Sequence, residues 1–277
     1  MYLSCIYNGK VRNVYELDDQ HLLMQTTDRV SAFNRHLCII PGKGELLNKI
    51  SELWFNKTKD IIDNHYISTY GACMIVKKCI PLKIEFVVRG YIAGNTNTSL
   101  WTYYNNGHRQ YCGINFPDGL IKNQKLLQPV VTPTTKTEND EPICKNDIIN
   151  KKYMSLEEYE FIHKKAIELF QYGQKNADKA GLILVDTKYE FGKNADGDII
   201  LIDELHTCDS SRYWIKETYE ERFTEKKEPD KLDKDCIRDW VKAQCDPYTQ
   251  PIPTIPNEII KKAYKNYKLF YEQLNKL

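Results

Sequence analysis

The sequence has no long apolar run, no excess of charge of one sign and no leader pattern. None of its apolar runs approaches the ~20 residues that a membrane helix needs, and residues 1–10 lack the charged and then apolar order of a signal peptide. Lys and Arg number 39 against 38 Asp and Glu, whereas a general nucleic-acid binder usually carries a clear basic excess. We therefore expect neither a membrane protein nor a nucleic-acid binder, and any anionic ligand must meet local clusters of cations.

Paired metal or disulfide motifs are also missing. The nine cysteines form no C-x-x-C pair and their number is odd, so neither a disulfide framework nor a zinc site is indicated. The six histidines show no metal-ligand spacing, and the sequence has no Walker loop and no Gly-x-Ser-x-Gly elbow. Free thiols in a reducing compartment are the favoured interpretation, which predicts a cytoplasmic protein.

What is present suits one compact enzyme or two closely packed lobes. The chain has 277 residues, of which 42% are apolar and 12% aromatic, enough for a substantial core. Strands are expected at residues 5–7 and 11–15, on either side of Asn8-Gly9, which is a strong signal for a two-residue hairpin. Apolar residues at helical spacing predict a helix from about residue 45 to 64.

The middle and end of the chain give further predictions. Pro81 separates expected strands at 72–76 and 84–88 and is interpreted as a hinge between lobes. Residues 92–150 are rich in Asn, Thr, Gly and Pro and predict long loops with short strands. Ser155 followed by Glu158 is a capping-box pattern that opens a helix ending at Gly181. Later elements are expected as strands at 182–191 and 198–204 and helices near 233–245 and 257–276.

The most informative stretch is the expected hairpin of residues 182–205. Asp196-Gly197 favours a type I′ turn, and counting back from it places Glu190 directly opposite Asp203. Two opposed carboxylates repel unless a cation lies between them, and Mg²⁺ is the natural candidate. Lys188 shares their face, whereas Phe191 and Ile202 are expected to face the core. A surface hairpin with solvated charges remains the alternative at this point.

Several short blocks along the chain carry a resemblance to a known family. In chain order they read GKVR at 9–12, DRVSAF at 28–33, VVRGY at 87–91, TPTTK at 132–136, DTKYEFG at 186–192, DE at 203–204 and DSSRYW at 209–214. This ordered set resembles the SAICAR synthases. Departures occur at Asn34, where the family often has Asp, at Cys208, where it has Pro, and in the segments 92–101 and 137–145.

The resemblance implies a fold and a reaction. The fold would be α+β, with a small N-terminal antiparallel lobe over 1–80, a larger α/β lobe over 81–277 and ATP in the cleft between them. The reaction joins the carboxylate of CAIR, an aminoimidazole ribonucleotide, to the amine of L-aspartate through an acyl phosphate, giving SAICAR, ADP and phosphate. A small-molecule kinase of related architecture and a catalytically silent nucleotide-binding module are the alternatives. The oligomeric state is left open.

The same resemblance, with the chemistry of the side chains, assigns candidate roles. The ATP phosphates are assigned to Gly9, Lys10 and Arg12, although an exposed basic strand would look the same. Glu190 and Asp203 are the expected Mg²⁺ ligands, and Arg89 is expected to bind the phosphate of CAIR. The remaining candidates for substrate binding or catalysis are Asp28, Lys136, Lys188, Ser210, Ser211 and Arg212.

Overall fold

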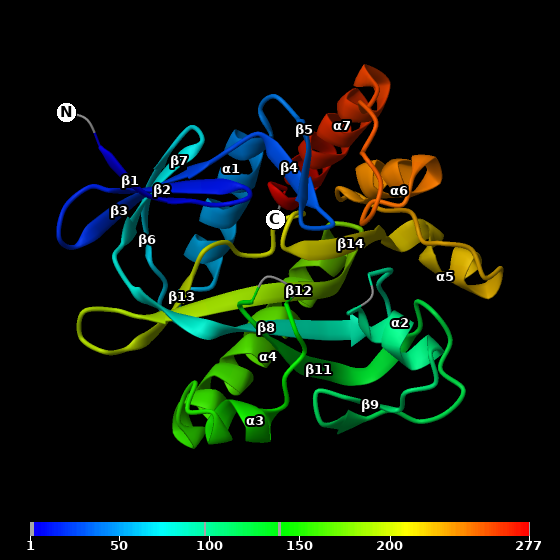
Figure 1. Ribbon diagram of the computed structural model, residues 1–277, viewed down its shortest axis with the longest axis horizontal. Helices are drawn as coiled ribbons and strands as arrows, with labels where there is room; N and C mark the ends of the chain where they lie inside the picture. The colour runs from blue at the N-terminus through cyan, green and yellow to red at the C-terminus, as the bar shows by residue number, and fades with distance from the viewer. Residues whose placement is uncertain (1–2, 97, 138–139, 277) are drawn as a thin grey trace.

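Two antiparallel sheets organise the protein, as the computed structural model in Figure 1 shows for residues 3–96, 98–137 and 140–276. The first sheet has the strand order β1-β2-β3-β7-β6, and the second has the order β11-β8-β12-β13, with β14 also paired to β12. Helices pack against both sheets, so the predicted α+β class is confirmed.

The strands of the first sheet are β1 (Ser4–Asn8), β2 (Arg12–Glu16), β3 (His21–Thr26), β6 (Tyr66–Tyr70) and β7 (Cys73–Lys77). Those of the second are β8 (Ile80–Tyr91), β11 (Lys125–Thr135), β12 (Leu182–Lys193), β13 (Ile199–Ile202) and β14 (Ser211–Ile215). Two small pairs are β4 (Arg29–Ala32) with β5 (Arg35–Ile39), and β9 (Gln110–Tyr111) with β10 (Ile114–Asn115). The helices are α1 (Lys43–Lys57), α2 (Leu100–Asn105), α3 (Lys145–Asn150), α4 (Leu156–Lys179), α5 (Lys216–Thr224), α6 (Asp235–Gln244) and α7 (Asn257–Leu274).

The helix α4 begins where the local sequence predicts it. The Ser155 hydroxyl accepts a hydrogen bond from the Glu158 backbone N–H at 3.1 Å, and the Glu158 carboxylate accepts one from the Ser155 N–H at 2.7 Å. These reciprocal bonds satisfy two of the N–H groups that every helix start leaves unpaired. The apolar face of α4 then packs against β8, β11 and β12 of the second sheet.

One hydrophobic core joins the two halves of the molecule. The same buried cluster contains Trp54 of α1, Phe86 of β8 and Phe270 of α7. In Figure 1, α1 lies between the first sheet and α7, and α1 contacts β3, β6 and α7. Among the described residues, no helix combines the length and the apolar character needed to cross a membrane.

A short backbone connection ties the first sheet to the edge of the second. Asn64, just before β6, forms a parallel bridge with Leu201 of β13. The Leu201 N–H donates to the Asp63 carbonyl at 2.9 Å, and the His65 N–H donates to the Leu201 carbonyl at 3.0 Å. This connection holds the end of β13 beside the loop between β1 and β2, which is why residues from both sheets meet there.

Three local predictions are wrong. The two-residue turn at Asn8-Gly9 does not form, because Asn8 pairs with Asn13 and residues 9–11 connect β1 to β2. Pro81 does not separate two strands but lies inside β8, opposite Gly192. Pairing of β8 with β11 starts only at Ile84, so the missing N–H of Pro81 leaves no bond to β11 unmade. The third wrong prediction is that residues 92–150 hold only short strands, because β11 within this stretch is a long strand of 11 residues.

Candidate active site

The hairpin β12–β13 forms in a register one residue away from the predicted one. Glu190 pairs with Ile202 and Phe191 with Leu201, so Asp203 is not opposite Glu190. The turn is longer than a two-residue turn because Asn194 closes it: its side-chain oxygen accepts from the backbone N–H groups of Asp196 and Asp198. Ile202 therefore shares a face with Glu190 rather than with Phe191, and the predicted face of Ile202 is wrong.

The two carboxylates nevertheless converge. Asp203 lies just past the end of β13 with a positive φ of 68°, so its side chain does not follow the alternation of the strand. The Lys188 ammonium contacts Glu190 and lies 3.3 Å from the nearer oxygen of Asp203. The expected grouping of Lys188, Glu190 and Asp203 is present, although the turn that predicted it is not.

The carboxylate directly opposite Glu190 is Glu85 of β8, which sequence reasoning missed. Its nearer oxygen lies 3.4 Å from the Lys188 ammonium. Burial raises the pKa of Glu85 to about 7, against the attraction of Lys188. The sequence does contain a signal for Glu85: it is a charged residue inside the apolar strand that ends at Arg89, and such a residue needs a partner.

Arg12 completes this cluster from the first sheet. Its guanidinium contacts Asp203 at 3.0 Å and forms a forked pair with Glu204 at 2.8 and 3.1 Å. Burial alone would raise the pKa of Asp203, but Arg12 and Lys188 hold it well below its usual range. Burial alone would likewise lower the pKa of Lys188, and the surrounding carboxylates raise it well above its ordinary value. Asp203, Lys188 and Arg12 are therefore charged at neutral pH.

The other candidates for phosphate contact lie around this cluster. The Lys10 ammonium is exposed and donates to the Asn34 side chain at 2.9 Å, and the Gly9 N–H closes the loop by donating to the Arg12 carbonyl at 2.7 Å. Lys136 contacts Glu190 from the end of β11. Asp28 instead accepts from the N–H groups of Gly42 and Gly44 at 3.0 and 2.9 Å, at the start of α1.

A second group of residues gathers around Asp186, which precedes Lys188 by two residues on β12. Arg212 of β14 contacts the Asp186 carboxylate directly, and Arg89 of β8 lies 3.6 Å from the same oxygen. Arg89 is fixed from its other side by a 2.9 Å bond to the Thr132 hydroxyl. A pocket opens beside Arg212, and its lining includes Ser210 and Ser211, whose part in substrate binding stays a prediction.

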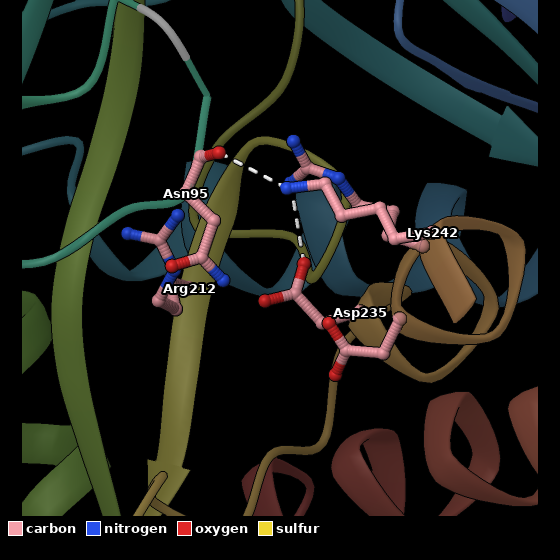
Figure 2. Close-up of a pocket in the computed structure, with 6 residues that line it drawn as sticks. Asn95, Arg212, Asp235 and Lys242 are labelled. Atoms are coloured by element: carbon pink, nitrogen blue, oxygen red, sulfur yellow. Dashed lines mark hydrogen bonds and ion pairs between the residues drawn. The ribbon is translucent and has the colours of Figure 1, made fainter. Parts of the chain in front are cut away.

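A second, smaller hollow adjoins this pocket and shares Arg212, Asp235 and Arg238 with it, and of its lining only Arg212 was predicted as a site residue. Figure 2 shows Asn95, Arg212, Asp235 and Lys242 around a small hollow that Arg238 and Asp239 also line. Asp235 accepts from Arg238 at 3.2 Å, and the Lys242 ammonium donates to the Asn95 backbone carbonyl at 3.0 Å. Asp235 and Arg238 lie on α6, more than twenty residues from Arg212 in sequence, and no local pattern connects them.

The carboxylate cluster fits a magnesium ion. Within the described ranges, no group of three or more His, Cys, Asp or Glu side chains is arranged as a complete metal cage. Mg²⁺, however, is usually held by one or two carboxylates plus substrate phosphates. Glu190 and Asp203 already share one cation, the Lys188 ammonium, so their oxygens face a common positive charge.

Comparison with known proteins gives a consistent result. The family model described as SAICAR synthetase matches residues 5–255. The chain is 51% identical over 271 residues to a phosphoribosylaminoimidazole-succinocarboxamide synthase of Legionella pneumophila (strain Paris), covering 97% of this chain and 86% of that protein. A chloroplastic protein of the same name from Arabidopsis thaliana is 49% identical over 269 residues, covering 96% of this chain and 65% of the relative.

Solved structures agree with these sequence relatives. The SAICAR synthase of Saccharomyces cerevisiae in complex with SAICAR superposes with a TM-score of 0.84 at 29% identity, over 99% of this chain and 95% of that one. A SAICAR synthetase in complex with ADP superposes with a TM-score of 0.74 at 26% identity, over 98% of this chain and 97% of that one.

Proposed function

Since the chain belongs to the SAICAR synthetase family and is an ATP-using ligase of purine biosynthesis, we propose that its two residue clusters bind the two ends of the reacting system. The first cluster, around Lys188, Glu190 and Asp203, takes the ATP phosphates. The second, around Asp186, Arg89 and Arg212, takes CAIR by its phosphate. The observation that carries this proposal is the placement of both clusters along the single strand β12.

The chemistry explains why each cluster contains cations. A carboxylate is a poor electrophile, so the carboxylate of CAIR must be activated as an acyl phosphate before the amine of L-aspartate can displace phosphate. Gathering three anionic reactants requires positive charge and positioning rather than a strong nucleophile. We assign Lys188 to the negative charge that develops on the transferred phosphoryl group, and Lys10 and Lys136 to phosphate or substrate contacts.

A metal ion would be held by Glu190 and Asp203. Mg²⁺, when bound there, would neutralise phosphate charge. Arg12 is held by Asp203 and Glu204, so its proposed part at the nucleotide is to orient these acids. Asp28, at the start of α1, is proposed to act by holding the adjacent Gly42-Lys43-Gly44 backbone in place. A cytoplasmic location stays a prediction.

A single assay separates the ligase from a kinase. ADP release is followed with CAIR, ATP, Mg²⁺ and L-aspartate, omitting each in turn, and every omission should abolish release. A small-molecule kinase is not favoured by the relatives, and it would release ADP without aspartate. Full ADP release in the absence of L-aspartate would contradict the proposed reaction, and SAICAR formation is checked in parallel by mass spectrometry.

A further inference from the structure

Glu85 is a largely buried carboxylate that faces another carboxylate. It lies directly opposite Glu190 across β8 and β12, and only 14% of its side chain is exposed. Like charges directly opposite each other in a sheet are destabilising, and a charge with little access to water needs compensation. The cation that compensates Glu85 is Lys188, at 3.4 Å.

Among the residues that the structure describes, Lys188 in turn has three carboxylate partners, and two of them are the proposed metal ligands. Under the proposed function, Glu190 and Asp203 bind the metal, and a carboxylate that coordinates a divalent cation offers less negative charge to a neighbouring ammonium. Glu85 is not among the proposed metal ligands. It is therefore the carboxylate partner, of the three, that Lys188 keeps when the other two hold the ion.

We propose that Glu85 is a positioning residue, which keeps the Lys188 ammonium directed at the transferred phosphoryl group while Glu190 and Asp203 hold the metal. The inference rests on the proposed function. A lysine carries its charge on a flexible four-carbon stem, so without a fixed partner its ammonium occupies several positions. Glu85 sits on the central strand β8, paired on both sides, and is itself held rigidly.

The first test is a double-mutant cycle on turnover. Glu85→Gln keeps the shape of the side chain and removes its charge, and kcat should fall roughly ten- to a hundred-fold, as expected for a misplaced catalytic group. KM for ATP and the Mg²⁺ affinity measured by calorimetry should change little. In a Lys188→Met background, Glu85→Gln should cause no further loss. Additive losses, or a large fall in Mg²⁺ affinity, would overturn the proposal, the latter by making Glu85 a metal ligand.

A second measurement does not depend on the reaction. In EDTA, Lys188 should be labelled faster by an amine-selective reagent in Glu85→Gln than in the unchanged protein, because one of its partners is lost. Glu85→Asp keeps the charge and should give intermediate labelling and kcat. Glu141→Gln, an exposed glutamate in the loop after β11, serves as the control. An unchanged labelling rate would overturn the role of Glu85. The proposed function is tested separately by aspartate-dependent ADP release, so the failure of one can be told from the failure of the other.

Discussion

At the scale of single residues, the side chain of Arg89 is held in one orientation by its protein contacts, before any ligand binds. Its Nε donates to Thr132, and one terminal nitrogen lies near Asp186, so the guanidinium plane is fixed. Few rotamers remain to be lost when an anion binds, and a planar fork suits phosphate. Arg89 therefore combines a structural contact with the chemistry proposed for it.

We expect Arg89→Lys to impair the use of CAIR much more than the binding of ATP. Lysine cannot form both the bond to Thr132 and a forked phosphate contact, so KM for CAIR should rise roughly ten-fold or more, which corresponds to the loss of one charge-assisted hydrogen bond. Steady-state kinetics with each substrate varied in turn measures the effect. If KM for ATP rises while that for CAIR stays constant, Arg89 belongs to the nucleotide site.

Another residue-scale property is the acid sensitivity of buried histidine. Burial lowers the pKa of His206 to about 3, and its Nε2 lies 2.6 Å from the Tyr189 hydroxyl. Below its ordinary pKa of 6.5 the unfolded chain binds a proton that the folded protein does not. The contribution of His206 to the free energy of unfolding therefore falls as the pH drops from 6.5 towards 3, by up to about 1.4 kcal/mol per pH unit.

We expect His206→Gln to remove this contribution between pH 6.5 and 5. Glu85 and Asp233, whose pKa values burial raises to about 7, contribute slopes of the opposite sign in this range, but they do so in both proteins, so the difference between the two slopes reports His206. Urea unfolding at several pH values measures the slope, and the amide can still accept from the Tyr189 hydroxyl. His65, whose pKa burial lowers to about 4, contributes in the same direction as His206 and is unchanged in the variant. Identical slopes for the variant and the unchanged protein would show that His206 does not carry the effect.

At the scale of elements, the position of the Asp203 carboxylate depends on the backbone conformation just past the end of β13 and not on the register of the hairpin β12–β13. A positive φ at Asp203 and the bridge from Leu201 to Asn64 bring the carboxylate to both Lys188 and Arg12. Arg12 and Asp203 are 191 positions apart in sequence, so this contact depends on the packing of one sheet against the other. The predicted turn could not reveal it.

Asp203→Asn should lower metal affinity and turnover together. The amide keeps the size, removes one ligand charge and leaves Arg12 with Glu204 as its remaining close carboxylate, so thermal stability should also fall modestly. Mg²⁺ titration, kcat and the melting temperature measure the three effects. Asp198→Asn, on the exposed turn of the same hairpin, is the matched control. Normal turnover of Asp203→Asn at low Mg²⁺ would refute the metal assignment.

At the scale of the whole molecule, the proposed division at residue 80 separates two sheets but not two cores. Lys43 of α1 is fully buried, and its ammonium lies 2.9 Å from Asp209. The Tyr267 hydroxyl of α7 donates to the same carboxylate at 2.6 Å, and Lys234 lies 3.9 Å from it. Asp209 thus ties the N-terminal part of the chain to its C-terminal helix beside the pocket at Arg212.

Lys43→Met should destabilise the entire protein, because it leaves Asp209 short of its nearest cation in the interior. Removing one partner of a buried pair costs about 3–5 kcal/mol, and the shared core predicts that both sheets unfold in one transition. Denaturant unfolding followed by fluorescence and circular dichroism checks both points. Lys49→Met, on the exposed side of the same helix, should change stability by less than about 1 kcal/mol. Equal stability of the two variants would refute the role of Lys43.

Local features of this protein were determined by the sequence alone. The start of α4 depends on Ser155 and Glu158, three positions apart, so neighbouring residues suffice to specify it. The ordered motifs along the chain likewise indicate the family, and they contain the groups to which we assign its chemistry, including Lys188, Glu190, Asp203 and Arg212. Such features need only the order of residues, because covalent neighbours are always close.

The tertiary structure alone decided which of these groups meet. The register of β12 with β13, the pairing of Glu85 with Glu190 and the approach of Arg89 and Arg212 to Asp186 all join segments distant in the chain. A strand has period two, so a one-residue change in register moves every side chain to the opposite face. The physical reason is that register is set by the packing of the whole sheet and its helices, to which a local turn contributes only one preference among many.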